Sequence, residues 1–214
     1  MVEDYVTLIW KAVEWPGGMP STTDLADQLG VTASTVSANL KKLARDGYIR
    51  YEPYGRIELT ESGREIAVGV VRCHRILETY LVNQLGLTWD QVHDEADRLE
   101  HAVSDLVLER MDAVLGHPRK DPHGDPIPDS DGVTVRDDSL PLSDISPDTT
   151  VEVARISDRS PDVLRYLQKR GIVVGSQVRV VDVSQAASAL QATVEGATVE
   201  LSLHSAGSIR VIPR

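Results

Sequence analysis

In the first sixty residues, residues that start helices and residues that stop them alternate at short intervals, and this spacing constrains the fold more than any other feature. A short helix is predicted to begin at a cap on Thr22 or Thr23 and to end at Gly30. A second helix is predicted to begin at Thr32 and to stop at Gly47. The chain therefore turns tightly between two short helices.

The flanking residues complete the order helix, helix, tight turn, helix, hairpin. Apolar residues at helical spacing predict a first helix over residues 5–14, and the breaker cluster WPGGMPS follows it. Residues 48–60, YIRYEPYGRIELT, predict two short strands around a Pro-Tyr-Gly turn. This order is the outline of a winged helix-turn-helix, whose third helix enters the major groove of DNA.

One side of that third helix is predicted to face the core through Val36, Leu40 and Leu43. The other side carries small hydroxyl residues that can approach phosphates and base edges, and basic residues that supply charge. The candidate DNA contacts are Thr32, Ser34, Thr35, Ser37, Lys42 and Arg45. The alternative is a helical packing module with a solvated polar face.

Charge and composition limit the cellular compartment and the binding partners that can be expected. The net charge of −11 argues against a generic nucleic-acid binder. However, residues 39–56 carry five basic and two acidic residues, whereas residues 121–148 carry eight aspartates and one arginine. The absence of a run of 18 apolar residues indicates no membrane span, and a single cysteine rules out an internal disulfide framework. These features favour a cytoplasmic protein.

The remaining chain is predicted to hold three further segments. Two long helices, to about Leu85 and from about Trp89 to Leu115, have wide apolar faces that suit dimerisation. A proline- and aspartate-rich linker follows. Short valine- and isoleucine-rich strands with one helix among them then predict a small β-barrel. The fold class is mainly α with a small β-barrel, and the expected domains are 1–60, 61–117, the linker 118–148, and 149–214.

A row of four ionisable residues lines one face of the second predicted long helix, and a pair of ionisable residues lies on the first predicted long helix. Spacings of three and four place such residues on one side of a helix. The residues are His93, Asp97, Glu100 and His101, and the pair is His74 and Glu78. The row could be a solvated surface, a salt-bridge network or a metal site. A divalent-metal site is the leading interpretation, because both helices carry the pattern.

The donor types indicate the metal. The set offers carboxylate oxygen and imidazole nitrogen without a thiolate, which fits Mn²⁺ or Fe²⁺ better than a soft ion. Cys73 adjoins His74, but neighbouring helical residues point about 100° apart, so Cys73 is interpreted as a packing residue.

Several motifs, in order along nearly the whole chain, resemble the diphtheria toxin repressor family of metal-dependent transcriptional regulators, in its manganese transport regulator branch. The motifs are EDYVTLIW, TVSANLKKLARDGYI, LTESGREIA, CHRILETYL, VHDEADRLEHAVSD and GDPIP. The resemblance implies a winged-helix DNA-binding domain, a helical metal-binding dimerisation domain and an SH3-like carboxy-terminal domain.

The resemblance also implies a primary metal site. Its positions are held here by Asp4, Asp97, Glu100 and His101. Iron-responsive members carry methionine and cysteine where this chain has Asp4 and Asp97. Both departures replace sulfur with oxygen, so manganese is expected in preference to iron.

An ancillary site is implied at His74, Glu78 and His93. Iron-type members complete it with a glutamate and a glutamine from the SH3-like domain, where this chain offers Ser160 and Val163. Asp158 or Asp162 could substitute. Thr7 stands where binuclear manganese regulators have a glutamate, so this chain is not expected to reproduce their complete binuclear site.

The function implied by the resemblance is a Mn(II)-dependent repressor that binds palindromic operator double-stranded DNA as a homodimer and controls metal-uptake genes. Fe(II) or Co(II) could occupy the site in vitro, and an iron(II)-dependent repressor is the alternative. Two rivals are a metallohydrolase, for which no catalytic motif is present, and a helical interaction module whose charged row forms salt bridges. The segment DPHGDPIP is interpreted either as a ligand of the SH3-like domain or as a flexible linker.

Overall fold

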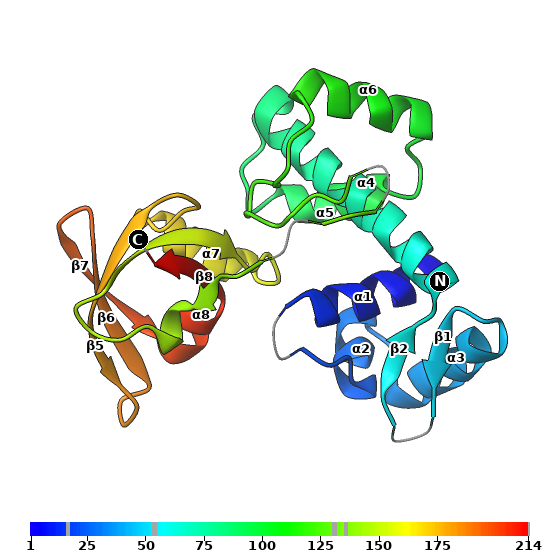
Figure 1. Cartoon of the computed structure of the whole chain (residues 1–214), viewed down its shortest axis with the longest axis horizontal. Helices are drawn as coiled ribbons and strands as arrows, with labels where there is room; N and C mark the ends of the chain where they lie inside the picture. Colours follow the sequence, from blue (N-terminus) through cyan, green and yellow to red (C-terminus); the bar gives the residue numbers. More distant parts are fainter. Residues whose placement is uncertain (16–17, 53–54, 130–131, 135–136, 214) are drawn as a thin grey trace. The chain divides into compact units, whose positions relative to one another are not determined.

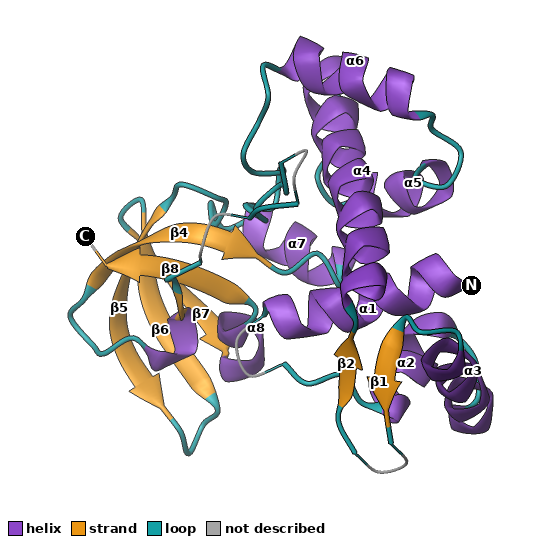
Figure 2. Ribbon diagram, turned by 45° about the vertical axis from the view of Figure 1, so that its right-hand side comes forward, coloured by secondary structure: helices purple, strands orange, loops and turns teal. Residues whose placement is uncertain are grey.

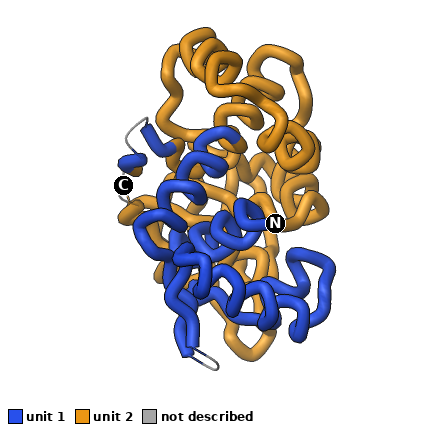
Figure 3. The backbone as a smooth tube through the Cα atoms, turned by 90° about the vertical axis from the view of Figure 1, so that its right-hand side faces the viewer, with its two compact units in different colours: residues 1–73, 128–133 blue, residues 74–127, 134–214 orange. Residues whose placement is uncertain are grey.

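The computed structural model describes residues 1–15, 18–52, 55–129, 132–134 and 137–213. They form two compact units, coloured separately in Figure 3. The first comprises Met1–Cys73 with Pro128–Val133, and the second comprises His74–Ile127 with Thr134–Arg214. Each unit has a hydrophobic core of its own.

The first unit begins with three helices and a hairpin, in the predicted order (Figure 1), and it also includes the first part of the next helix, α4 (Glu61–Leu85). The three helices and the hairpin strands are α1 (Val2–Glu14), α2 (Thr22–Leu29), α3 (Ala33–Arg45), β1 (Ile49–Tyr51) and β2 (Ile57–Leu59). The two strands pair antiparallel, with Ile49 opposite Leu59. Parts of the breaker cluster and of the Pro-Tyr-Gly turn, residues 16–17 and 53–54, lie outside the described residues.

Helix α2 begins one residue earlier than the sequence predicts. Its cap is Ser21, whose hydroxyl accepts a hydrogen bond from the Asp24 backbone N–H at 3.0 Å, so Thr22 and Thr23 already belong to the helix. Gly30 ends the helix in the left-handed conformation, at φ +63°, which glycine adopts without strain. The predicted stop is confirmed.

Helix α3 is anchored to the core as predicted. Thr32 caps it by accepting from the Thr35 backbone N–H at 3.2 Å. Val36, Leu40 and Leu43 are buried in the cluster that also holds residues of α1, α2 and both strands. Burial of this face leaves the opposite side of α3 for solvent or a partner.

The second long helix of the prediction is two helices. The described chain has α4 (Glu61–Leu85), α5 (Val92–Leu99) and α6 (Asp105–Leu115). The backbone turns after Leu99, and Ser104 starts a new helix in an extended conformation, so the continuous helix from Trp89 to Leu115 was wrong. Glu100 and His101 therefore lie in a turn. None of the helices in the described part of the chain is both long and apolar enough to cross a membrane.

The carboxy-terminal part is a six-stranded antiparallel sheet with two short helices (Figure 2). Its order is β3-β8-β4-β5-β6-β7. The elements are β3 (Leu140–Pro141), the 3₁₀ turn η1 (Leu142–Asp144), β4 (Thr150–Ile156), α7 (Pro161–Gln168), β5 (Gln177–Ser184), β6 (Ala189–Val194), β7 (Ala197–Ser202), α8 (Leu203–Gly207) and β8 (Ile209–Pro213).

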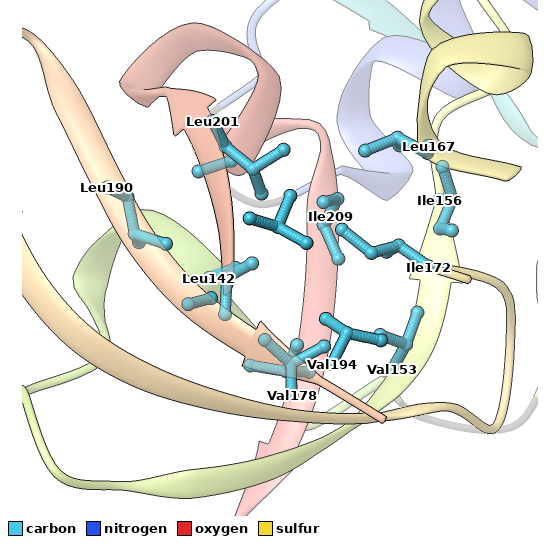
Figure 4. Packing of buried hydrophobic residues seen from close by; sticks show 14 of the residues in the cluster. Leu142, Val153, Ile156, Leu167, Ile172, Val178, Leu190, Val194, Leu201 and Ile209 are labelled. Atoms are coloured by element: carbon cyan, nitrogen blue, oxygen red, sulfur yellow. The ribbon is translucent and has the colours of Figure 1, made fainter. Parts of the chain in front are cut away.

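The predicted closed β-barrel is wrong, because the described strands form an open sheet. Strand β3 has two residues and pairs with β8, while β7 pairs with β6, and no ladder among the described residues joins these two edges. Side chains from η1, the strands and α7 fill the core instead, as Figure 4 shows for Leu142, Leu167 and Ile209.

Part of the proline- and aspartate-rich segment packs tightly in the second unit. Residues 121–127 form a compact loop in which the Asp121 backbone N–H donates to the Asp125 carbonyl at 3.0 Å. His123 is fully buried, and its carbonyl accepts from the Ile156 N–H at 2.9 Å. Gly124 has φ +87°, and a Cβ there would lie 2.2 Å from the Ala154 carbonyl oxygen. This stretch is thus fixed against the end of β4.

Candidate metal centre and DNA-contacting helix

His74 on α4 stands at the middle of the charged residues in the second unit. It is buried, with its Nδ1 atom 2.6 Å from Glu100 Oε2 and 3.2 Å from Asp97 Oδ1. Its Nε2 atom lies 3.1 Å from Glu78 Oε1 and 3.2 Å from His93 Nδ1. One imidazole thus touches the predicted ancillary residues on one edge and two of the predicted primary residues on the other.

The C-terminal domain contributes Asp158 to this group. Asp158 Oδ2 lies 3.1 Å from His93 Nδ1, and the atoms of His74, Glu78, His93 and Asp158 are close enough to share one ion. Asp162 is exposed and pairs with Arg165 at 2.5 Å. Of the two aspartates left open by the sequence, Asp158 is the one placed at the group.

Ser160 and Val163, the residues at the positions of the family's glutamate and glutamine, have structural roles. The Ser160 hydroxyl caps α7 by accepting from the Val163 N–H at 3.4 Å. The Val163 side chain packs against the core of the sheet. Neither side chain supplies a ligand atom to the group.

The predicted primary site is assembled only in part within this unit. Asp97 and Glu100 meet at His74, and His101 Nε2 lies 3.5 Å from Glu100 Oε1. Asp4 belongs to the first unit, where its carboxylate lies 2.8 Å from the amino terminus. Its participation stays a prediction.

Two further residues, Asp121 and His123, meet Glu78 from the compact loop, and the sequence analysis did not assign them. His123 Nδ1 lies 3.6 Å from Glu78 Oε2, and both atoms are buried without a hydrogen-bond partner. His123 Nε2 lies 2.8 Å from the Trp89 carbonyl oxygen, to which it donates. The available signal was a histidine between two aspartates in DPHGD, which was interpreted only as linker or peptide ligand.

The carboxylates and imidazoles of this cluster shift one another's pKa values. Burial opposes ionisation of Glu78, but the charge of His74 and contacts with His123, His74 and His93 hold its pKa well below the usual range. Burial likewise opposes charging of His93, whereas Asp158 and Glu78 raise its pKa to about 9. Against the same penalty, Glu78 and Asp121 raise the pKa of His123 to about 10. Burial and the nearby carboxylates Asp125 and Glu78 raise the pKa of Asp121.

The predicted DNA-contacting residues share the outer side of α3. All are exposed except Ser37, which is half-buried; they are Thr32, Ser34, Thr35, Ser37, Lys42 and Arg45. The hydroxyls at the amino end bond to one another, with Thr32 Oγ1 2.8 Å from Ser34 Oγ. Arg45 pairs with Asp46 at 2.9 Å. The side of α3 opposite the core is thus hydroxyl-rich at one end and basic at the other.

Helix α6 exposes apolar side chains on its surface. Leu106 is 63% exposed and Val114 is 62% exposed, and Val107 is also exposed. Large apolar side chains grouped in this way are typical of an interface between protein chains.

Three family models match most of the chain. The N-terminal DNA-binding domain of iron-dependent repressors matches residues 1–57, and their metal-binding and dimerisation domain matches residues 60–129. The FeoA domain matches residues 140–213. The diphtheria toxin repressor of Corynebacterium glutamicum is 31% identical over 98% of this chain and 94% of that protein. The chain belongs to the diphtheria toxin repressor family.

Other members of the diphtheria toxin repressor family agree with this assignment. The repressor of Corynebacterium diphtheriae is 33% identical, with 84% of each chain covered. A solved manganese-dependent transcriptional repressor in complex with manganese is 44% identical, with a TM-score of 0.95 and full coverage of both chains. The manganese regulator SloR is 28% identical, with a TM-score of 0.85, covering 100% of this chain and 98% of that one.

These matches confirm the family and its manganese branch, as the sequence motifs indicated. The diphtheria toxin repressor family consists of DNA-binding transcriptional repressors, so the metallohydrolase interpretation is set aside. The interpretation as a helical interaction module is also set aside, because residues 60–129 match a domain that is described as metal-binding and dimerising.

Proposed function

We propose that this protein is a cytoplasmic, manganese-dependent transcriptional repressor that binds palindromic operator DNA as a homodimer and controls metal-uptake genes. The observation that carries the proposal is the position of His74, whose buried ring lies between two sets of carboxylates. One set is Asp97 with Glu100, and the other is Glu78 with Asp158. The naming of two similar structures as manganese regulators supports the choice of metal.

The residues present fit a hard divalent ion. The donors are imidazole nitrogens and carboxylate oxygens, which suit Mn²⁺ better than a soft ion. Glu78 Oε2 and His123 Nδ1 are buried polar atoms without hydrogen-bond partners, which a proton or a metal between them would satisfy. We assign one site to Asp4, Asp97, Glu100 and His101, and another to His74, Glu78, His93 and Asp158, with Asp121 and His123 beside it.

The proposed mechanism uses the chain's own carboxylates as a switch. Without metal, Asp97, Glu100 and Asp4 repel one another and leave α1 loosely held. A bound cation supplies the positive charge that neutralises them. Asp4 would then tie the DNA-binding unit to the dimerisation helices and fix the separation of the two α3 helices. Metal and operator therefore favour the same arrangement, and each raises affinity for the other.

The dimer is proposed to form through α6. Its exposed Leu106, Val107 and Val114 give an apolar surface that a second copy would cover. A two-fold arrangement of α3 matches a palindromic site. An iron(II)-dependent repressor is the second candidate, because the matching family models describe iron-dependent repressors.

Replacing Lys42 with alanine tests the DNA-contacting helix. Lys42 is exposed in the last turn of α3, so its loss is expected to weaken operator binding uniformly across sequences. The slope of log affinity against log salt should fall by about one. The measurement is fluorescence anisotropy of an operator duplex with saturating Mn²⁺ at several salt concentrations.

The matched control is Lys169→Ala, which removes the same charge from an exposed position in the C-terminal domain. It should leave affinity and salt slope close to those of the unaltered chain. Equal slopes for the two variants would remove Lys42 from the DNA interface.

A further inference from the structure

Asp125, in the compact loop, joins two buried arginines that come from different elements. Its Oδ2 atom accepts from Arg75 Nη2 at 3.2 Å, and its Oδ1 atom accepts from Arg155 Nε. Arg75 follows His74 on α4, and Arg155 lies on β4. The two arginines are 2% and 1% exposed. One carboxylate therefore links the helix that bears His74 and Glu78 to the strand that leads to Asp158.

The same contacts fix the loop that carries His123. Arg75 Nη1 donates to the Pro126 carbonyl at 2.6 Å. Asp121 Oδ1 accepts from the backbone N–H groups of His123 and Asp125, at 2.9 and 2.8 Å. The His123 side chain, near the middle of this loop, points to Glu78. A shift of Asp125 would displace His123 with it.

The end of β4 depends on the loop as well. The Ile156 N–H donates to the His123 carbonyl at 2.9 Å, and Asp158 follows two residues later. Arg155, beside Ile156, is held by Asp125. The positions of His123 and Asp158 are therefore set by one short network centred on Asp125.

Because the two arginines are buried, losing their shared carboxylate is costly. A guanidinium removed from water is stable only when it keeps close, hydrogen-bonded counter-charges. Without the Asp125 charge, Arg75 and Arg155 would lose the carboxylate that they share, and the loop or the strand would have to move. Groups that orient metal ligands in this way typically change metal affinity by about 10–100-fold when they are altered.

We propose that Asp125 is a positioning residue for the metal centre: by holding Arg75 and Arg155 on one carboxylate, it directs His123 toward Glu78 and brings Asp158 to His93. The inference rests on the proposed metal-binding function. It assigns a role to Asp125, which is not among the proposed metal ligands.

Asp137 provides a matched control. It is also an aspartate that pairs with Arg155, at 3.3 Å from Nη1, but its second partner is Arg210 on β8, at 3.3 Å from Nε. Replacing either aspartate with asparagine removes one carboxylate charge from Arg155. Asp125→Asn alone breaks the link to Arg75.

The test is a Mn²⁺ titration of the full-length chain, followed by the electron paramagnetic resonance signal of free Mn²⁺, for the unaltered chain and for D125N and D137N. Thermal melting in chelator is measured beside it. We expect D125N to lower the affinity of the site containing Glu78 by about 10–100-fold, and D137N to change it by about twofold or less. Both variants should melt at lower temperature in chelator, so stability alone would not separate them.

Two further variants keep the test decisive. If Asp125 acts through His123, the two substitutions should not be additive. The double variant H123Q/D125N should then lose little more Mn²⁺ affinity than D125N or H123Q alone. Arg155→Lys keeps the buried cation and should give a smaller loss at the same site. Equal Mn²⁺ affinity for D125N and D137N would overturn the proposal. If the unaltered chain bound no Mn²⁺, the proposed function would fail and the role of Asp125 with it, whereas equal binding by D125N and D137N would overturn the role of Asp125 alone.

Discussion

Replacing Glu78 with glutamine is expected to abolish Mn²⁺ binding at the site formed with His74, His93 and Asp158. Glu78 is fully buried, with Oε1 3.1 Å from His74 Nε2 and Oε2 3.6 Å from His123 Nδ1. Glutamine keeps the shape and removes the charge that balances the surrounding imidazoles. The loss of Mn²⁺ affinity should exceed the loss of about 10–100-fold that is typical when a group outside the ligand set is altered. Isothermal titration calorimetry should show fewer Mn²⁺ ions bound per chain.

Glu109→Gln is the control for this variant, because Glu109 is exposed on α6 and its change has the same chemistry. It should bind as many ions as the unaltered chain. The Asp97 and Glu100 group should retain its ion in the Glu78 variant as well. If E78Q kept the full number of ions at unaltered affinity, Glu78 would not be a ligand.

Mn²⁺ affinity is expected to rise steeply with pH well beyond the range of an ordinary histidine. The pKa of His93 is raised to about 9 and that of His123 to about 10, so both carry protons at neutral pH. A metal ion bound by His93 must displace the extra proton of that imidazole, and one displaced proton contributes about tenfold in affinity per pH unit. Mn²⁺ affinity should therefore rise about tenfold per pH unit until the pH approaches the His93 pKa of about 9.

The metal-free chain should show the opposite trend. Because folding raises the pKa of His93 and His123, their stabilisation is complete below the ordinary value of 6.5 and is lost as pH rises through about 9 and 10. Calorimetry in buffers of different ionisation enthalpy counts the protons released by Mn²⁺, under anaerobic conditions. Release of no protons at pH 7.5 would contradict the raised pKa values.

The sequence predicted the residues that lie on helices better than those in loops. His74 and Glu78 are one turn apart on α4, so helical spacing alone placed them on one face. His93 and Asp97 were found in the same way on α5. His123 and Asp121 lie in a proline-rich loop without a repeating period, and their approach to Glu78 depends on contacts with β4.

Two errors of the fold prediction have definite physical reasons. The break after Leu99 has neither glycine nor proline to mark it, and only Ser104 with Asp105 signals the new helix start. The open sheet depends on which strands pair at its edges, and strand composition does not encode that pairing. A set of short valine- and isoleucine-rich strands was therefore not enough to predict whether the sheet closes into a barrel.

Asp158 places a carboxylate of the FeoA domain beside His93. Iron-type members use a glutamate and a glutamine, but Ser160 and Val163 serve α7 and the sheet core here. Asp158, just after β4, brings a carboxylate to His93 instead. Any metal held by His93 and Asp158 would thus connect the FeoA domain to α5.

The most direct test of metal-dependent repression is anisotropy of a palindromic duplex from the protein's own promoter region, at fixed salt, titrated with Mn²⁺, Fe²⁺, Co²⁺ and Zn²⁺ in chelator-stripped buffer. Salt is fixed because phosphate contacts make affinity strongly salt-dependent. The account predicts weak binding without metal and tight binding with Mn²⁺ at lower free concentration than Fe²⁺ requires. Operator affinity that is the same in chelator and in Mn²⁺ would contradict it.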